Sequence, residues 1–516
     1  MQFLDKLLAP FQMALRQSVE TFIRLETADD EITLATQDGS LVTYFRIDGS
    51  RQIIGEEEYR FLVDAATVKI GSKFDRQGHA LQVVFLRDPE RSGPQIEKLI
   101  HPARVTAQNI GLDMDDLLDE RVRNLSNILT KEECYFVAWT RPSAMTKSET
   151  ERTVVEKQAQ MKKWVNAGYA QNPFAGLEPL RTRHKSYVSS LKSALDELGV
   201  RAEVLEVHDA LRAVRSGMFP SKANDSWKAC LPGDPMPPRA PPSAIDLSDI
   251  MWPPLRAQIA AADARTIDGS IVQIGDMLWA GADMTLGPME CLPFPMLLNR
   301  LYDARTPYRI SFMIEGGGAS ASQFRTFLAT IMSVTNGLNK QIKYSLEGLQ
   351  VMARSEPVVK LRVSFCTWAR KDQYDVVRDR LSTLIQSVES WGYAQVSEVS
   401  GDPLDCVMAS AMGIHCAGTA PAAIAPMREV MKLLPWQRPS SPFNQGSILL
   451  RSPDGKAWPY QTGTNLTTTW FDLIFAQPGA GKSVLMNALN LGTVLSPGLA
   501  NYRLLPSLIL VHHHRV

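Results

Sequence analysis

The stretch that decides the fold class lies near the C-terminus, where residues 470–492 read WFDLIFAQPGAGKSVLMNALNLG. Its first part, Phe471–Phe475, is a short apolar run that predicts a buried strand. Apolar residues return at helical spacing from Val484 onward and predict a helix. Between them lies the loop AQPGAGKS, residues 476–483. A strand, a glycine-rich loop ending in Gly-Lys-Ser and a helix, in that order, are typical of a phosphate-binding P-loop in an α/β protein.

The residue types of this loop suit the binding of a polyphosphate. Gly479 and Gly481 allow the backbone to curl so that successive N–H groups converge, and the helix N-terminus adds positive potential. Lys482 is expected to reach the β- and γ-phosphates, and the Ser483 hydroxyl to bind the Mg²⁺ that accompanies the nucleotide. ATP and Mg²⁺ are therefore the expected cofactors. The candidate nucleotide-binding residues are Gln477, Pro478, Gly479, Ala480, Gly481, Lys482 and Ser483.

Two features depart from a complete nucleotide-hydrolysing site. The first glycine of the usual motif is replaced by Ala476, and a chance Gly-Lys-Ser at a turn is the alternative interpretation. The 33 residues from Val484 to Val516 contain neither Asp nor Glu, whereas hydrolysis needs carboxylates that organise Mg²⁺ and water. We name no catalytic residue for this reason. We expect the motor domain to be cut short, and this chain alone to hydrolyse ATP far below an enzymatic rate.

Composition excludes several classes of protein. The 516 residues include 55 Lys and Arg and 55 Asp and Glu, so the formal net charge is zero. This balance disfavours a broadly basic nucleic-acid binder and leaves a local basic patch open, and we expect no direct sequence-specific contact with nucleic acid. Six cysteines without a C-x-x-C pair support neither a disulfide framework nor a zinc site, and favour a reducing compartment. No uncharged apolar run is long enough to predict a transmembrane helix.

A proline-rich segment divides the chain before the P-loop. Residues 232–243 read PGDPMPPRAPPS and hold six prolines, a density that excludes helix and sheet and predicts a connector, with a proline-motif ligand as the alternative. Strands and helices alternate on both sides, so we expect an α+β N-terminal part with mixed sheets, followed by an incomplete RecA-like core. The predicted regions are an N-terminal α/β region at 1–231, a linker at 232–254, a second α/β region at 255–440 and the start of the motor domain at 441–516.

Local patterns predict the first elements of the chain. Residues 1–24 carry apolar side chains at helical spacing, interrupted by charges; this predicts an amphipathic helix, docked either on its own domain or on a membrane or partner. Alternating apolar residues on both sides of Asp38-Gly39 predict a β-hairpin. Helices are expected at 56–70 and over most of 110–130, with a strand at 81–86 between them.

One order of predicted elements occurs twice in the sequence. A strand ends in Trp139-Thr140-Arg141, helices follow and stop at Gly199, and another strand and helix come next. The second half repeats this order from Trp368-Ala369-Arg370 through a helix that stops at Gly392. A common order of elements with matching end signals predicts an internal duplication.

Two further patterns have a structural and a functional interpretation. Residues 315–322, EGGGASAS, follow a predicted strand; a flexible turn is the structural interpretation and a phosphate-binding turn the functional one. His415-Cys416 is the one adjacent His/Cys pair. Its structural interpretation is a small buried thiol beside a hydrogen-bonded histidine.

The order of these segments resembles the large cytoplasmic ATPases of type IV secretion and conjugation systems, in the IcmB/DotO/TraU branch. The hairpin ITLATQDGSLVTYFRIDG at 32–49 is similar to the start of that family. The unit from Phe365 to Val399 resembles its strand, helix, Trp-Gly-Tyr and strand. PDGKAWPYQTG at 453–463 and FDLIFAQPGAGKSVLMNALN at 471–490 are similar to its approach to the P-loop. The likeness covers roughly residues 1–503.

The resemblance implies an N-terminal α/β region followed by a RecA-like motor. It also implies hexamers that are cytoplasmic and peripheral to the inner membrane, where they contact other secretion or conjugation subunits and energise substrate transfer or apparatus assembly. The chain departs from the family pattern after Tyr502-Arg503, so we expect a truncated or frameshifted product or one half of a split protein.

Two alternative functions remain open at this point. One is a non-catalytic structural or docking subunit of the same apparatus with a remnant P-loop. The other is an unrelated P-loop kinase or GTPase, which is disfavoured because such enzymes also need sequence after the loop.

Overall fold

The computed structural model describes most of the chain and divides it into two compact units. Unit 1 holds Met1–Leu86 and Glu133–Pro439, and unit 2 holds Arg87–Glu132 and Ser440–Val516. The described residues are 18–74, 77–161, 177–222, 226–232, 234, 253–302, 304–318, 321, 347–348, 351, 353, 356–398, 401–443, 446–452, 455–461, 474–475 and 477–496.

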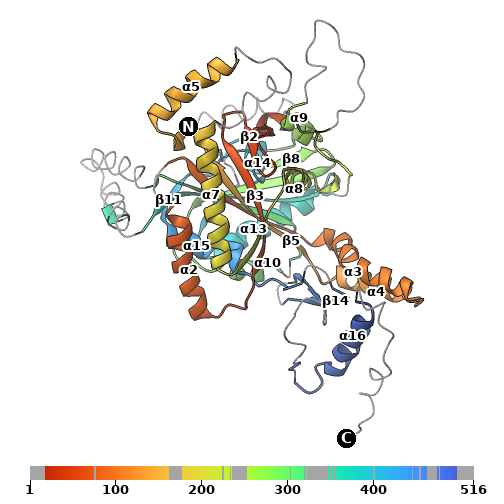
Figure 1. The fold of residues 1–516 in the computed structure, drawn as a ribbon. Coiled ribbons are helices and arrows are strands. Elements are labelled where there is room, and N and C mark those ends of the chain that lie inside the picture. The colour runs from red at the N-terminus through yellow and green to blue at the C-terminus, as the bar shows by residue number, and fades with distance from the viewer. Residues whose placement is uncertain are drawn as a thin grey trace, which may run out of the picture. The chain divides into compact units, whose positions relative to one another are not determined.

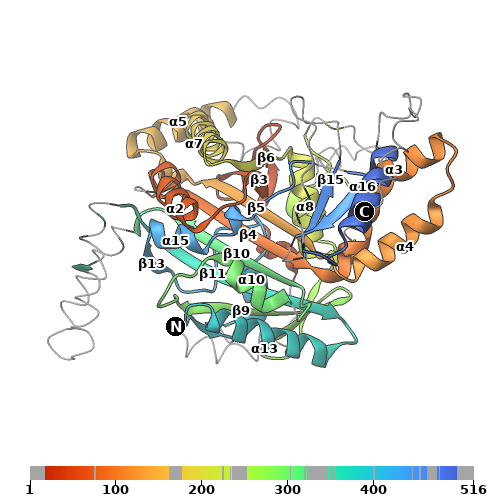
Figure 2. The same cartoon turned by 90° about the horizontal axis from the view of Figure 1, so that it is seen from below.

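Unit 1 is built on one large sheet (Figures 1 and 2). Among the described residues it has 13 strands in the order β1-β2-β3-β5-β4-β10-β11-β9-β8-β7, with β6 on β3, β12 on β9 and β13 on β11. The strands are β1 (Leu25–Ala28), β2 (Leu34–Thr36), β3 (Leu41–Ser50), β4 (His79–Asp88), β5 (Lys131–Thr140), β6 (Val200–Val204), β7 (Ala264–Thr266), β8 (Ile271–Ile274), β9 (Met277–Leu286), β10 (Tyr308–Glu315), β11 (Val358–Arg370), β12 (Gln395–Ser397) and β13 (Ala423–Pro426).

The sheet corrects one part of the expected fold class. Strand pairing is antiparallel wherever the register of the strands of unit 1 is defined, whereas mixed sheets were expected. Short hairpin connections join β1 to β2, β2 to β3, β7 to β8 and β8 to β9, and such connections can only produce antiparallel neighbours. The protein is nevertheless a mixed α and β structure, as expected.

The predicted hairpin at Asp38-Gly39 is confirmed. β2 and β3 pair with Leu34 opposite Val42. Gly39 has φ +80°, and the Asp38 carboxylate accepts a hydrogen bond from the Ser40 N–H at 3.0 Å. This left-handed glycine and the Asp side chain together close the turn.

Helices cover both faces of the sheet because successive strand residues point to opposite sides. On β3, Phe45 and Ile47 join one apolar cluster, while Val42 and Tyr44 join the other. The first cluster is completed by α2 (Glu56–Gly71), α7 (Glu178–Glu197), α10 (Phe294–Tyr302), α13 (Tyr374–Ser390) and α15 (Met427–Leu433). The second is completed by η1 (Val19–Phe22), α8 (Val207–Met218), α9 (Leu255–Ile259) and α14 (Pro403–Ala409).

The two halves of unit 1 have the same strand order, as the predicted internal duplication requires. In the first half β3 pairs with β5 and β6, and in the second half β9 pairs with β11 and β12. The strand registers of the two halves also match at the tryptophan near the end of each repeated strand. Trp139 of β5 lies opposite Val42 of β3, and Trp368 of β11 lies opposite Trp279 of β9. Helices α7 and α13 occupy the same place in the two halves, and the chain leaves them through left-handed glycines, Gly199 and Gly392.

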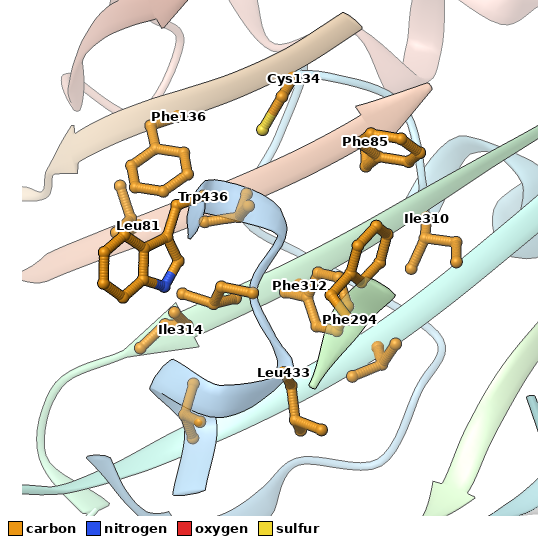
Figure 3. Packing of buried hydrophobic residues seen from close by; sticks show 14 of the residues in the cluster. Leu81, Phe85, Cys134, Phe136, Phe294, Ile310, Phe312, Ile314, Leu433 and Trp436 are labelled. Carbon is orange, nitrogen blue, oxygen red and sulfur yellow. The ribbon is translucent and has the colours of Figure 1, made fainter. Parts of the chain in front are cut away.

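The two halves meet at the neighbouring strands β4 and β10. Figure 3 shows Leu81 and Phe85 of β4 facing Ile310, Phe312 and Ile314 of β10, with Trp436 packed against them. These side chains are almost fully buried, and each contributes about 2 kcal/mol of hydrophobic stabilisation. Strands from both expected α/β regions, 1–231 and 255–440, therefore belong to a single sheet, and the domain division itself stays a prediction.

Unit 2 joins an insertion after β4 to the C-terminal part of the chain. Ile96, Ile100 and Leu118 form a small core with Leu129, Leu449 and Ala457. Its described elements are η2 (Pro89–Arg91), α3 (Ser92–Asn109), α4 (Asp115–Ser126), the hairpin β14 (Ile448–Arg451) and β15 (Ala457–Tyr460), and α16 (Lys482–Val494).

Several expectations are corrected or fall outside the described residues. The helix expected over 110–130 is α4, which follows the longer α3. The described part of the expected 1–24 helix is the 3₁₀ turn Val19–Phe22, after which the chain enters a strand; 1–17 are not described. The linker 232–254 and the segment 462–473 also lie wholly or mostly outside the described residues. The remaining elements are η3 (Pro142–Ala144), α5 (Lys147–Met161), η4 (Pro220–Lys222) and η6 (Pro435–Gln437).

Candidate nucleotide-binding site

The seven candidate residues form a tight loop and the first turn of α16. The Ala480 N–H donates to the Gln477 carbonyl at 3.2 Å and closes a turn. Gly479 has φ +82° and Gly481 φ +84°. A Cβ built on either glycine would meet nothing within 4 Å. These two positions therefore favour glycine for their left-handed backbone, and open space lies beside them.

The helix N-terminus supplies the polar groups of the site. The N–H of Leu485 donates to the Gly481 carbonyl at 3.0 Å and starts the helical ladder. The N–H groups of the residues before Leu485 precede this ladder and point toward the loop end of the helix. Lys482 and Ser483 are the first two helical residues, and both are exposed. Convergent amides, an ammonium group and a hydroxyl at a positive helix end suit an anion with several oxygens.

The far end of α16 is anchored inside unit 2. Leu495 is buried and packs with Ala103 and Ala107 of α3. A Cβ on Gly492 would lie 2.3 Å from Ile448 of β14, so the helix approaches the hairpin more closely than a larger residue allows. This anchoring fixes the helix whose other end carries Lys482.

The near end of α16 has apolar side chains in solvent. Val484 is 73% exposed, Met486 49% and Phe475 87%. In a complete P-loop domain the helix and the preceding strand are buried in a sheet. The expected strand Phe471–Phe475 is not seen in its two described residues, Ile474 and Phe475, which belong to no strand; Ala476 lies outside the described residues.

Three acidic residues of α3 and α4 are engaged with one arginine. Arg104 forms ion pairs with Glu97 at 3.3 Å, Asp115 at 2.7 Å and Asp119 at 2.7 Å. Burial raises the pKa of Asp88 to about 6, and its carboxylate caps η2 by accepting from the Glu90 N–H. These carboxylates have structural roles. Within the described ranges, no group of three or more His, Cys, Asp or Glu residues is placed to hold a metal ion.

The second glycine-rich turn has a structural explanation. Glu315, its first residue, forms ion pairs with Arg141 at 2.6 Å and with Arg362. A Cβ on Gly318 would lie 2.5 Å from the Val358 carbonyl, so packing against β11 requires glycine there. The arginines beside the turn already hold a carboxylate, which supports the turn over the phosphate site.

His415 is buried, as the structural interpretation expects, but its ring nitrogens make no hydrogen bond of good geometry with the described residues, so the expected hydrogen-bonded histidine is not found. Burial lowers the pKa of His415 to about 4, so the imidazole is neutral at pH 7. Burial likewise raises the pKa of the Cys416 thiol far above its usual range. A neutral imidazole beside a protonated thiol is a poor nucleophilic pair.

One feature of unit 1 was not predicted from the sequence. A cavity of about 650 Å³ lies between α7 and the loop before β2, and the buried His184 forms part of its lining. The available signal was a polar residue four positions before Val188, on the apolar stripe of a predicted helix. Because a histidine on such a stripe is more often structural, the sequence does not predict a functional role for His184.

The comparisons with known proteins do not assign this chain to a family. No family model matches the chain, and no curated protein matches it. Among the helices that the structure describes, none combines the length and apolar character needed to cross a membrane.

Proposed function

We propose that residues 477–483 bind the phosphates of a magnesium–ATP complex, and that the chain is an ATP-binding subunit of a type IV secretion or conjugative DNA-transfer system. The observation that carries the nucleotide part is the pair of left-handed glycines directly before a helix that begins with Lys482 and Ser483. The loop backbone would cradle the phosphates, Lys482 would neutralise their charge, and the Ser483 hydroxyl would hold Mg²⁺. The metal, when bound, supplies charge neutralisation between the phosphate oxygens.

The apparatus part of the proposal rests on the family resemblance of the sequence. By that resemblance the full-length protein energises substrate transfer or apparatus assembly as a hexameric motor with a RecA-like core. It would lie in the cytoplasm, peripheral to the inner membrane, and contact other subunits of the machine. The 33 residues after Ser483 bring no carboxylate, so this chain by itself is proposed to bind ATP without turning it over at an enzymatic rate.

A second candidate function is favoured by the exposed apolar residues at the start of α16. Phe475 and Val484 are largely exposed, and Met486 is about half exposed. Clustered exposed apolar groups of this kind mark sites of protein contact. In this alternative the loop is a remnant, and the chain is a docking subunit of the same apparatus.

Titration with a fluorescent ATP analogue in the presence of Mg²⁺ tests the nucleotide proposal. Lys482→Ala should weaken binding about tenfold or more, because a charge-assisted contact is lost. Lys98→Ala is the matched control, since Lys98 is an exposed lysine of unit 2 on α3 and outside the loop. Equal affinity of wild type and Lys482→Ala would refute phosphate binding by the loop.

Steady-state phosphate release separates the two candidate functions from an active enzyme. Wild type and Lys482→Ala should release phosphate at the same negligible rate. Lysine-dependent turnover near 1 s⁻¹, at the low end of typical enzyme rates, would show that a carboxylate from elsewhere in the chain completes the site. Met486→Gln, which adds no charge and lies outside the seven candidate residues, should leave nucleotide binding unchanged but reduce recovery with the membrane fraction if the docking function is correct.

A further inference from the structure

The cavity beside α7 has mostly apolar walls and belongs wholly to the first half of unit 1. Its volume is about 650 Å³, within the range of roughly 300 to 1,000 Å³ that is usual for small-molecule sites. It lies between α7, the loop that joins β1 to β2, and the end of β6. The lining residues that matter to the argument are Thr33, His184, Val188, Ser189, Lys192 and Val204.

A buried polar cluster supports this wall of the cavity. His184 is only 1% exposed. Its Nε2 is hydrogen-bonded to Thr43 Oγ1 at 2.8 Å, and its Nδ1 to Thr140 Oγ1 at 2.9 Å. Thr43 lies on β3 and Thr140 on β5, and both are fully buried. The imidazole is therefore held in one orientation by both nitrogens.

The second half of unit 1 shows that the fold does not require this cluster. The strand registers make Val42 equivalent to Trp279, so the next residue, Thr43, is equivalent to Ala280. They likewise make Trp139 equivalent to Trp368, so Thr140 is equivalent to Ala369. Counting back 15 residues from Gly199 gives His184, and 15 from Gly392 gives Val377. The three equivalents are buried and apolar: Ala280, Ala369 and Val377.

The cavity itself also distinguishes the first half. By the same registers, Thr33 corresponds to Ile271, Val188 to Leu381 and Lys192 to Ile385. Each residue of the second half fills more apolar volume at its position, and Ile271 and Leu381 are buried. At these equivalent positions the first half carries smaller or polar residues around one concave surface. The second half has the same fold and carries larger apolar packing residues there.

The charges at the rim favour a ligand without charge. Lys185 lies 3.7 Å from Asp30, and Lys192 lies 2.6 Å from Asp196. Both lysines that line the cavity thus already have a carboxylate partner. Glu31 also lines the cavity, and the two carboxylates and two lysines of the lining leave it without formal net charge. The hydroxyl groups of Thr33 and Ser189 provide hydrogen bonds of moderate strength instead.

We infer that this cavity binds a neutral, largely apolar small molecule, with the ring of His184 as a fixed part of its wall. The volume suits a molecule of two or three rings or an equivalent aliphatic chain. This site lies in unit 1 and is independent of the proposed nucleotide site, so either assignment stands or falls alone.

Fluorescence titration of the full chain with N-phenyl-1-naphthylamine, a neutral apolar probe, tests the inference. Wild type should bind the probe saturably. Ser189→Trp places a large side chain from an exposed lining position across the cavity and should weaken binding about tenfold or more. Ser186→Trp is the matched control, because Ser186 is exposed on the same helix and is not part of the lining.

A second variant keeps the test independent of that bulky substitution. Thr33→Ile with Val188→Leu and Lys192→Ile installs the residues that the second half carries at the same positions, and it too should lose binding while the thermal melting temperature is kept or raised. Absence of saturable binding to wild type overturns the inference. Unchanged binding in Ser189→Trp, or equal loss in Ser189→Trp and Ser186→Trp, also overturns it, because the probe then binds elsewhere.

Discussion

The buried His184 makes unit 1 sensitive to mild acid, and the duplication provides a variant that removes the sensitivity. Burial lowers the pKa of His184 from its ordinary 6.5 to about 4. Between these values the unfolded chain binds a proton that the folded chain does not. Stability from this group is therefore fully present above pH 6.5 and falls as the pH drops toward 4.

The size of the effect follows from the two pKa values. At pH 5 the difference between 6.5 and about 4 corresponds to a loss of about 2 kcal/mol relative to pH 7.5. The triple variant Thr43→Ala, Thr140→Ala, His184→Val introduces the residues of the second half at all three positions. It should fold and should show a pH dependence smaller than that of wild type by about this amount.

Urea unfolding at pH 7.5 and pH 5, followed by tryptophan fluorescence, measures this difference. Among the described residues of unit 1, five tryptophans are buried: Trp139, Trp279, Trp368, Trp391 and Trp436. The double variant Thr43→Ala, Thr140→Ala keeps the buried histidine and is the control that should retain the acid sensitivity.

Other titrating groups cancel when the triple variant is compared with the double variant, because both lack the Thr140 hydroxyl that lies 3.2 Å from His79 Nδ1. Burial also lowers the pKa of His79 and His415 to about 4, and both act in the same direction as His184. Asp405 acts in the opposite direction, because burial and then the charges of Asp402 and Asp283 raise its pKa to about 6; its contribution is lost as the pH rises through 6. An identical pH dependence in the double variant and the triple variant would refute the assignment of acid sensitivity to His184.

Two further predictions concern the packing of unit 1. Gly392→Ala should destabilise the protein by about 2 kcal/mol more than Gly199→Ala, which costs about 1 kcal/mol. Both glycines are left-handed, but a Cβ on Gly392 would lie 2.1 Å from the Glu290 carbonyl oxygen, whereas one on Gly199 meets nothing within 4 Å; equal losses in urea unfolding would refute the steric explanation. Tyr44→Phe should cost about 1 kcal/mol, because the buried hydroxyl donates to the Gly413 carbonyl at 2.9 Å, and a calorimetric melting temperature equal to that of wild type would contradict this.

Local chemistry explains what could be predicted from the sequence. The hairpin at Asp38-Gly39 follows from two residues, because an Asp side chain and a left-handed glycine close the turn without help from the rest of the chain. The ends of α7 and α13 at Gly199 and Gly392 are local in the same sense. The curl of the loop at Gly479 and Gly481 also follows from the motif, and the seven candidate residues are neighbours in the chain.

The duplication was predictable because both copies carry the same short signals. A strand ending in Trp139 or Trp368, a helix ending in glycine and a following strand are each read within a few residues. The sequence could not show that the copies share one sheet, since the contact between β4 and β10 joins residues more than 200 positions apart. The sequence of an apolar run such as β4 or β10 does not indicate which strand it pairs with.

Tertiary structure alone decided the composition of unit 2 and the candidate site of unit 1. Residues 87–132 belong with the C-terminal segment because their apolar faces pack together, as Ile100 and Leu449 do, and no local pattern encodes that choice. His184, Thr43 and Thr140 come from three separate elements, and each has a common structural explanation when considered alone. These three residues can be recognised as one cluster beside a cavity only in the folded structure. Hydrogen bonds between residues distant in sequence depend on how the strands and helices that carry them are arranged in space.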